Sequence, residues 1–266
     1  MTAPHVVLVH GAWAGPWVWD NVVGPLRAAG AIPHTPALPG VGTWAADEEI
    51  TLDTVADTVS ALVASLDGPV FLVGHSGGGG VVTAVAERLH ERIAGVAYVA
   101  GMMLESGRTF GDLCEEIGLH PPVGISKWLR PTADGRGTTV PVEAGAAVFF
   151  HGAGAEDAIG AARRLVPQLE TARLIAPVWS PGRFGRLPRL YIEATEDRTL
   201  PLAAQREMQQ RVPGAQVVSL ACDHAPQLSA TSALVEALVR FTLGAEPERG
   251  QREADRAANR RRALRT

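Results

Sequence analysis

Residues 70–80 read VFLVGHSGGGG, and residues 81–86 continue as VVTAVA. An apolar strand, a glycine-flanked serine and the start of a helix follow one another directly, which is the G-x-S-x-G nucleophile elbow in the context that it requires. A serine on so sharp a turn has a strained backbone, and Cβ atoms on its neighbours would collide where the strand and the helix cross. We therefore expect Ser76 to be a nucleophile at the C-terminal end of a sheet.

A glycine-rich stretch of this kind has one competing interpretation, a dinucleotide-binding loop. Ser76 occupies the position of the second glycine in G-x-G-x-x-G, and the stretch does not follow the first strand of the chain. No strand ending in an acidic residue follows about 20 residues later, as that fingerprint requires. The dinucleotide interpretation is therefore disfavoured.

The composition is that of an ordinary globular protein, with 266 residues, 46% hydrophobic and 20% charged. A net charge of −4 gives no electrostatic basis for binding nucleic acid or an anionic membrane. There is no signal-peptide pattern and no apolar run of membrane-spanning length. Two cysteines, Cys114 and Cys222, do not make a disulfide framework, so we expect a cytoplasmic monomer or homodimer with reduced thiols.

Short apolar segments alternate with segments of helical periodicity, which predicts a doubly wound, mostly parallel α/β sheet. The predicted strands are 5–9, 32–38, 70–73, 93–100, 190–194 and 217–220, and the predicted helices are 16–29, 51–66, 77–90, 202–211 and 226–243.

Residues 101–186 interrupt this alternation. They are rich in Gly and Pro, carry several aromatic residues and show only short helical stretches such as 156–166. A segment too long for a loop at this place predicts an inserted helical lid over a core formed by residues 1–100 and 187–245. Residues 246–266 form an Arg-rich tail, for which we expect disorder or a solvated helix.

A serine nucleophile needs a base to take its proton and a carboxylate to orient that base. In folds with this elbow the order along the chain is serine, acid, histidine, with the acid and the histidine after strand ends. Asp197 follows the strand at 190–194 and His224 follows the strand at 217–220, so they are the candidate acid and base.

Three glutamates compete with Asp197 for the acid position. Glu196 is adjacent, Glu193 lies on the same predicted strand, and Glu105 follows an earlier strand end. Asp223, beside the histidine, is interpreted as a turn or cap residue rather than as the acid. Cys222 is interpreted as a small core residue.

An oxyanion that forms on the substrate needs two backbone N–H donors. We expect one from Gly77 at the start of the helix and one from Ala12, in the loop after the first strand. His10 and His75 are interpreted mainly as structural residues of these two loops. His34, His120 and His151 show no metal-like spacing, so neither a metal nor an organic cofactor is expected.

Four stretches resemble one family: VLVHGAWAGPWVW at 7–19, LVPQL at 165–169, YIEATED at 191–197 with Leu200-Pro201, and DHAPQLS at 223–229. They look like the plant methyl esterase and hydroxynitrile lyase family of α/β-hydrolases, over about residues 5–243. The resemblance implies the α/β-hydrolase fold and a Ser-His-Asp triad.

Two departures from that family bear on the reaction. Lyases of the group resemble one another in a threonine after the entry histidine and a lysine after the catalytic histidine, where this chain has Gly11 and Ala225. Cyanohydrin cleavage is therefore not expected. The esterase members are closer but carry a larger apolar residue at the position of Ala225, so their substrates cannot be transferred to this chain.

The sequence thus predicts a serine esterase for a small, largely apolar ester or lactone. The alternatives are a lyase, eliminase or cyclase that uses the same triad as acid and base, and a non-catalytic binding protein. Residues expected to contact the substrate are Trp13, His75, Trp128, Phe149 and Ala225.

Overall fold

The computed structural model describes residues 2–47, 49–120 and 123–244. The tail predicted at 246–266 lies outside the described residues. Within the described part of the chain, no helix is long and apolar enough to cross a membrane.

A six-stranded sheet forms the centre of the molecule, and all of its strand pairs are parallel. Its order is β2-β1-β3-β4-β8-β9, and the bounds are β1 His5–Val9, β2 Ile32–His34, β3 Val70–His75, β4 Ile93–Val99, β8 Arg189–Ala194 and β9 Ala215–Leu220. The predicted strands are all present. The second is shorter than predicted; it is an edge strand, and Pro36, just after its end, removes a ladder donor.

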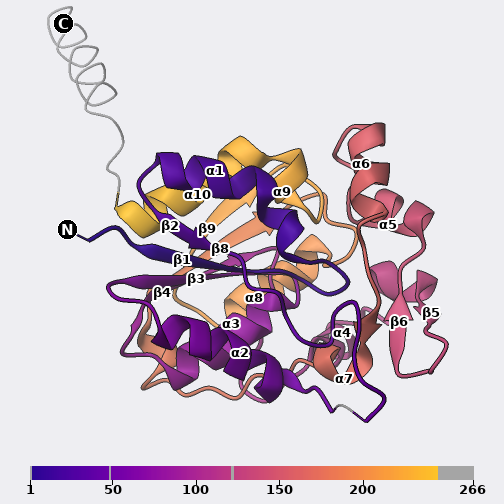
Figure 1. Cartoon of the computed structure of the whole chain (residues 1–266), viewed down its shortest axis with the longest axis horizontal. Coiled ribbons are helices and arrows are strands. Elements are labelled where there is room, and N and C mark those ends of the chain that lie inside the picture. Colours follow the sequence, from indigo (N-terminus) through magenta and orange to yellow (C-terminus); the bar gives the residue numbers. More distant parts are fainter. Residues whose placement is uncertain (1, 48, 121–122, 245–266) are drawn as a thin grey trace, which may run out of the picture.

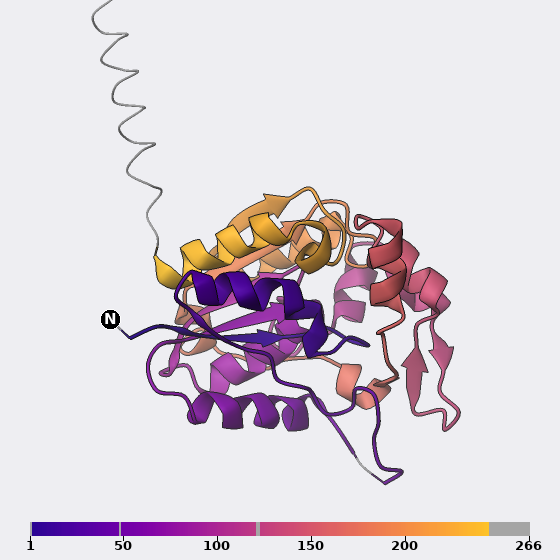
Figure 2. The ribbon, with the colours of Figure 1, turned by 45° about the horizontal axis from the view of Figure 1, so that its top comes forward.

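Helices cover both faces of this sheet (Figures 1 and 2). Alternate residues of β1 explain why: Val6 and Leu8 join the apolar cluster on one face, while Val7 and Val9 join the cluster on the other. On the first face lie the 3-10 helix η1 (Pro16–Trp19), α1 (Asp20–Ala28), α9 (Pro226–Ser229) and α10 (Thr231–Leu243); on the second lie α2 (Leu52–Ala64), α3 (Gly78–Arg88) and α8 (Leu202–Arg211). The predicted helix 226–243 is divided because Ala230 leaves helical geometry, with φ −142° and ψ 38°.

Much of the segment between β4 and β8 lies to one side of the sheet in Figure 1, and its last residues return to pack against α3. It comprises α4 (Phe110–Glu116), η2 (Gly124–Trp128), β5 (Arg130–Pro131), β6 (Gly137–Thr139), α5 (Val142–Val148), α6 (Ala155–Ala162), β7 (Gln168–Leu169), α7 (Glu170–Arg173) and η3 (Phe184–Arg186). The antiparallel sheet β5-β6-β7 differs from the expectation of helices alone. Strands of two or three residues are too short to show a period-two pattern, so the sequence could not indicate them.

Candidate active site

Ser76 lies at the sharp turn between β3 and α3, and its φ of 52° is in the left-handed region. For a residue other than glycine this conformation costs on the order of 1–3 kcal/mol and persists only where neighbours enforce it. Its amide N–H donates to the Val99 carbonyl at 3.2 Å, and its carbonyl accepts from the amides of Gly79 and Met102 at 3.0 and 2.9 Å. Backbone bonds to β4 and to the chain beyond it therefore hold the strained turn.

The glycines around Ser76 are required by backbone packing. A Cβ on Gly74 would lie 2.5 Å from the Gly78 carbonyl oxygen, and a Cβ on Gly78 would lie 2.7 Å from the Val9 carbonyl oxygen. Both distances are shorter than real Cβ contacts, and the obstacles are main-chain atoms that cannot rotate away. The crossing of β3, α3 and the end of β1 thus accounts for the G-x-S-x-G pattern.

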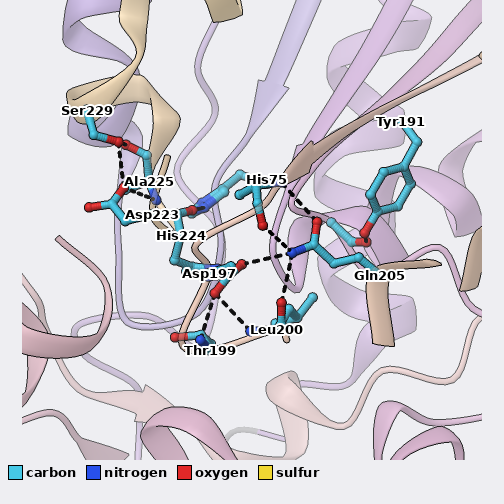
Figure 3. A network of polar contacts seen from close by, with 12 residues as sticks. His75, Tyr191, Asp197, Thr199, Leu200, Gln205, Asp223, His224, Ala225 and Ser229 are labelled. Atoms are coloured by element: carbon cyan, nitrogen blue, oxygen red, sulfur yellow. Dashed lines mark hydrogen bonds and ion pairs between the residues drawn. The ribbon is translucent and has the colours of Figure 1, made fainter. Parts of the chain in front are cut away.

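His224 and Asp197 meet in a buried contact, as Figure 3 shows. The distance from His224 Nδ1 to Asp197 Oδ2 is 2.7 Å, and the two side chains are 3% and 0% exposed. The other carboxylate oxygen accepts the amide N–H groups of Thr199 and Leu200 at 2.6 and 3.0 Å. These bonds orient the carboxylate, and the carboxylate orients the imidazole with its Nδ1–H toward Asp197.

The buried side chain of Gln205, on α8, stabilises the loop that carries Asp197 (Figure 3). Its Oε1 accepts the Ala194 amide at 3.1 Å, while its Nε2 donates to the carbonyls of Ala194 and Leu200 at 3.0 and 2.8 Å. One carboxamide thereby joins the end of β8 to the far side of the Asp197 turn.

The three competing glutamates are placed elsewhere. Glu193 accepts bonds from Arg206, Gln209 and Ser219. Glu105 pairs with Arg211 at 3.2 Å, and Glu196 is exposed. Among the described residues, Asp197 is the carboxylate that contacts His224.

Two buried histidines shape the loops beside Ser76. His75 donates from Nε2 to the main-chain carbonyl of His224 at 2.8 Å, and burial together with the nearby His224 lowers the pKa of His75 to about 3. His10 donates from Nδ1 to the Gly11 carbonyl at 2.9 Å, and burial lowers its pKa to about 4. Both imidazoles are therefore neutral near pH 7.

The bond from His10 also fixes the direction of the Ala12 amide. Because a peptide group is planar and trans, holding the Gly11 carbonyl oxygen sets where the Ala12 N–H points. In the described part of the chain, neither the Ala12 N–H nor the Gly77 N–H donates to a protein acceptor. Ala12 and Gly77 thus bring two unused donors to the same cavity as Ser76.

This cavity has a volume of about 370 Å³. Ser76, His224, Ala12 and Gly77 all line it. Much of the remaining wall is apolar, and it includes Trp13, Val18, Met102, Phe110, Ile125, Phe149, Phe150, Leu165, Leu174, Ile175, Leu200 and Ala225. Arg173 is the one lysine, arginine or carboxylate side chain in the described lining, an exception that the sequence did not indicate.

Of the five residues expected to contact substrate, four line the cavity: Trp13, His75, Phe149 and Ala225. Phe149 stacks on the His224 ring with centroids 5.4 Å apart and on Trp13 at 6.2 Å. Trp128 does not line the cavity. It is 49% exposed at the end of η2, with the Lys127 ammonium 5.4 Å above its ring, whereas Ile125 earlier in η2 reaches the cavity.

Asp223 has the turn role expected of it and a longer-range contact as well. Its Oδ1 accepts the Ala225 amide at 3.0 Å and the Ser229 hydroxyl at 2.6 Å (Figure 3). Its Oδ2 accepts the Gly152 amide at 2.7 Å, which ties the histidine loop to the chain just after Phe149. The described residues contain no cluster of three or more His, Cys, Asp or Glu side chains suited to a metal ion.

Known proteins that are similar to this chain are named as esterases and hydrolases. A pyrethroid hydrolase from Sphingobium wenxiniae is 31% identical over 91% of this chain and 88% of its own length. A carbendazim-hydrolysing esterase from a Nocardioides species is 31% identical over 87% of this chain and 97% of its own. The crystal structure of the Arabidopsis methylesterase MES16 aligns with a TM-score of 0.74 and 26% identity, covering 91% of this chain and all of that one.

The resemblance to plant methyl esterases is thereby confirmed. A family model described as the alpha/beta hydrolase family matches residues 6–237, which spans both the elbow and the histidine loop. The fold, the strained serine turn and these relatives all indicate the same family. This chain therefore belongs to the α/β-hydrolase family.

Proposed function

We propose that this protein hydrolyses carboxylic esters or lactones through an acyl-enzyme formed on Ser76. The observation that carries the proposal is the content of one cavity: a strained serine, a histidine bound to a buried carboxylate, and two backbone amides without protein acceptors. The relatives named as esterases and hydrolases support it.

In this mechanism His224 Nε2 takes the proton of Ser76 Oγ as the oxygen attacks the ester carbonyl. Asp197 keeps the Nδ1 proton of His224 in place and stabilises the imidazolium that forms. The N–H groups of Ala12 and Gly77 bind the oxyanion of the tetrahedral intermediate. His224 then protonates the leaving alcohol, and water repeats the sequence to release the acid.

The substrate that suits the cavity is a weakly polar ester with a ring or an alkyl body. The volume of about 370 Å³ lies at the small end of ligand pockets, and aromatic and aliphatic side chains predominate in its wall. In this proposal residues 101–186 act as the lid, because Phe110, Ile125, Phe149 and Phe150 all belong to that segment and line the cavity.

Two positions argue against cyanohydrin cleavage, the reaction of the lyases in the family that the sequence resembles. Ala225 lines the cavity at the position where those lyases carry a lysine, so this position supplies no cation for a departing cyanide. At Gly11, a Cβ would lie 2.7 Å from the Ser76 Cβ, which leaves no room for a threonine without displacement of the elbow.

The test combines a panel of p-nitrophenyl esters with a fluorophosphonate probe read by intact mass. The proposal expects turnover of at least one ester and stoichiometric labelling of the protein. Labelling without ester turnover would favour the lyase alternative, and neither labelling nor turnover would favour a binding protein.

The aromatic wall gives a prediction about specificity. Phe149→Ala should raise KM for a bulky aryl ester more than KM for an acetate ester, because the ring that contacts His224 and the cavity is lost. Trp128→Ala is the matched control and should change neither KM by more than about twofold, since exposed side chains outside a site contribute little. Steady-state kinetics on the two esters measures this, and equal effects of Phe149→Ala on both would contradict it.

The buried histidines lead to a prediction about pH. With pKa values of about 3 and 4, His75 and His10 remain neutral down to pH 5 and contribute no transition there. A plot of log kcat/KM against pH should therefore show no step from His75 or His10 between pH 7 and pH 5, whereas a step in this range that disappears on substitution of either histidine would contradict the prediction.

A further inference from the structure

Trp13 directly follows the candidate oxyanion donor Ala12, and its φ of 57° is left-handed. A tryptophan adopts this conformation only where its surroundings impose it. Three of its polar groups bond to the segment 101–186. Its amide N–H donates to Gln168 Oε1 at 3.3 Å, its carbonyl accepts the Val166 amide at 2.8 Å, and its indole Nε1–H donates to Thr138 Oγ1 at 3.2 Å.

These bonds lie on the peptide groups that surround Ala12. His10 holds the carbonyl of the Gly11–Ala12 peptide, and Gln168 holds the N–H of the Ala12–Trp13 peptide. With the planes on both sides of the Ala12 Cα fixed, its amide has little freedom to turn away from the cavity. Gln168 is therefore the side chain from outside the loop that fixes the second plane.

Both the side chain and the backbone of Gln168 are held in place by hydrogen bonds. It is 4% exposed, and its Nε2 donates to the Leu169 carbonyl at 3.3 Å. Its backbone pairs with Thr138 in the β6–β7 ladder and forms a bridge with Val41. Gln168 also lines a second cavity of about 30 Å³ together with Ala12 and Gly77.

The indole ring of Trp13 is held by a second set of contacts. Thr138 donates its hydroxyl to Glu170 Oε1 at 2.6 Å, so its oxygen is left to accept the Trp13 indole N–H. Arg173 donates from Nε to the same Glu170 at 3.1 Å, and its guanidinium carbon lies 5.3 Å from the centre of a Trp13 ring. Trp13 is thus held both at its backbone and at its ring.

We propose that Gln168 is a positioning residue for the oxyanion hole, acting on the Ala12 amide through the Trp13 backbone. The segment 101–186 then completes the hole as well as covering the cavity. This inference rests on the proposed function, because it assigns Gln168 to the stabilisation of a tetrahedral intermediate on Ser76.

The test compares Gln168→Met with Gln227→Met. Methionine has nearly the same shape as glutamine but no hydrogen-bonding carboxamide. Gln227 is the matched control, since it is fully buried and its carboxamide has no partner among the described residues. Two quantities are measured: kcat and KM on p-nitrophenyl acetate, and the Kd of a trifluoromethyl ketone, which forms a tetrahedral adduct with the serine.

We expect Gln168→Met to lower kcat about tenfold, with KM within about twofold, because deleting an oxyanion donor outright costs about 10²- to 10³-fold and this donor is displaced rather than deleted. The Kd of the trifluoromethyl ketone should rise by the same factor. Gln227→Met should change neither quantity by more than about twofold. A purely structural role for Gln168 would lower the melting temperature without this parallel loss.

A folded Gln168→Met variant with unchanged kcat, or with unchanged ketone affinity, would overturn the inference. If that variant does not fold, Thr138→Val is used instead, because it removes the acceptor of the Trp13 indole N–H. It should lower kcat by about threefold, and no change would again overturn the inference. Failure of the proposed function is a separate result, seen as a wild-type protein without turnover; the ketone Kd still tests Gln168 in that case.

Discussion

Replacing Ser76 with alanine should reduce ester turnover by on the order of 10³-fold or more while the fold is retained. The hydroxyl is the atom that forms the acyl-enzyme, and only binding and the oxyanion donors remain to lower the barrier without it. Alanine keeps the Cβ and places no new atom in the crowded elbow, so the melting temperature should change little. Steady-state kinetics on the most active p-nitrophenyl ester, with circular dichroism of the variant, measures both effects.

Ser126→Ala is the matched control for this experiment. Ser126 lines the same cavity from η2, and its hydroxyl donates to the Val123 carbonyl at 2.6 Å. It should keep turnover within about threefold of the wild type and retain stoichiometric fluorophosphonate labelling. Near-native turnover by Ser76→Ala would show that the covalent mechanism is wrong.

His224→Ala should cost about as much as Ser76→Ala, because nucleophile and base act as one unit. Asp197→Asn should cost somewhat less but still at least about 10²-fold, since an amide that donates to Nδ1 favours the wrong tautomer of His224. The 2.7 Å contact between the buried Asp197 and His224 is the physical reason for expecting this loss. Both variants are measured by kcat/KM on the same ester.

Glu105→Gln is the control for the acid. Glu105 forms an ion pair with Arg211 and not with His224. Its neutralisation should therefore leave kcat/KM within about twofold. A harmless Asp197→Asn combined with a crippling Glu105→Gln would instead move the acid to the earlier strand end.

Local patterns were enough to predict the fold. Alternate burial in β1 and the strand–serine–helix order around Ser76 are consequences of short-range geometry, since a strand alternates its faces and a tight turn between β3 and α3 excludes Cβ atoms. The placement of Asp197 after β8 and of His224 after β9 also follows from chain order, because parallel strands bring their C-terminal ends to one edge.

The residues that line the cavity could not be predicted from the sequence in the same way. Trp128 and Phe149 are both aromatic residues of the same segment, yet Phe149 stacks on His224 and Trp128 is half exposed. The choice depends on how η2 and α5 pack over the sheet, which no local periodicity encodes. Arg173 reaches the cavity for the same reason, and its side chain gave no signal in the sequence.

The sequence by itself determined the parallel α/β sheet, the elbow at Ser76 and the loops that carry Asp197 and His224, because each depends on residues adjacent along the chain. Only the tertiary structure decided which carboxylate contacts His224 and which side chains surround the Ala12 amide. Gln168 and Trp13 are 155 positions apart, and their 3.3 Å hydrogen bond forms only when the 101–186 segment packs on the loop after β1. Contacts of that separation depend on how whole elements pack, and so they become visible only in three dimensions.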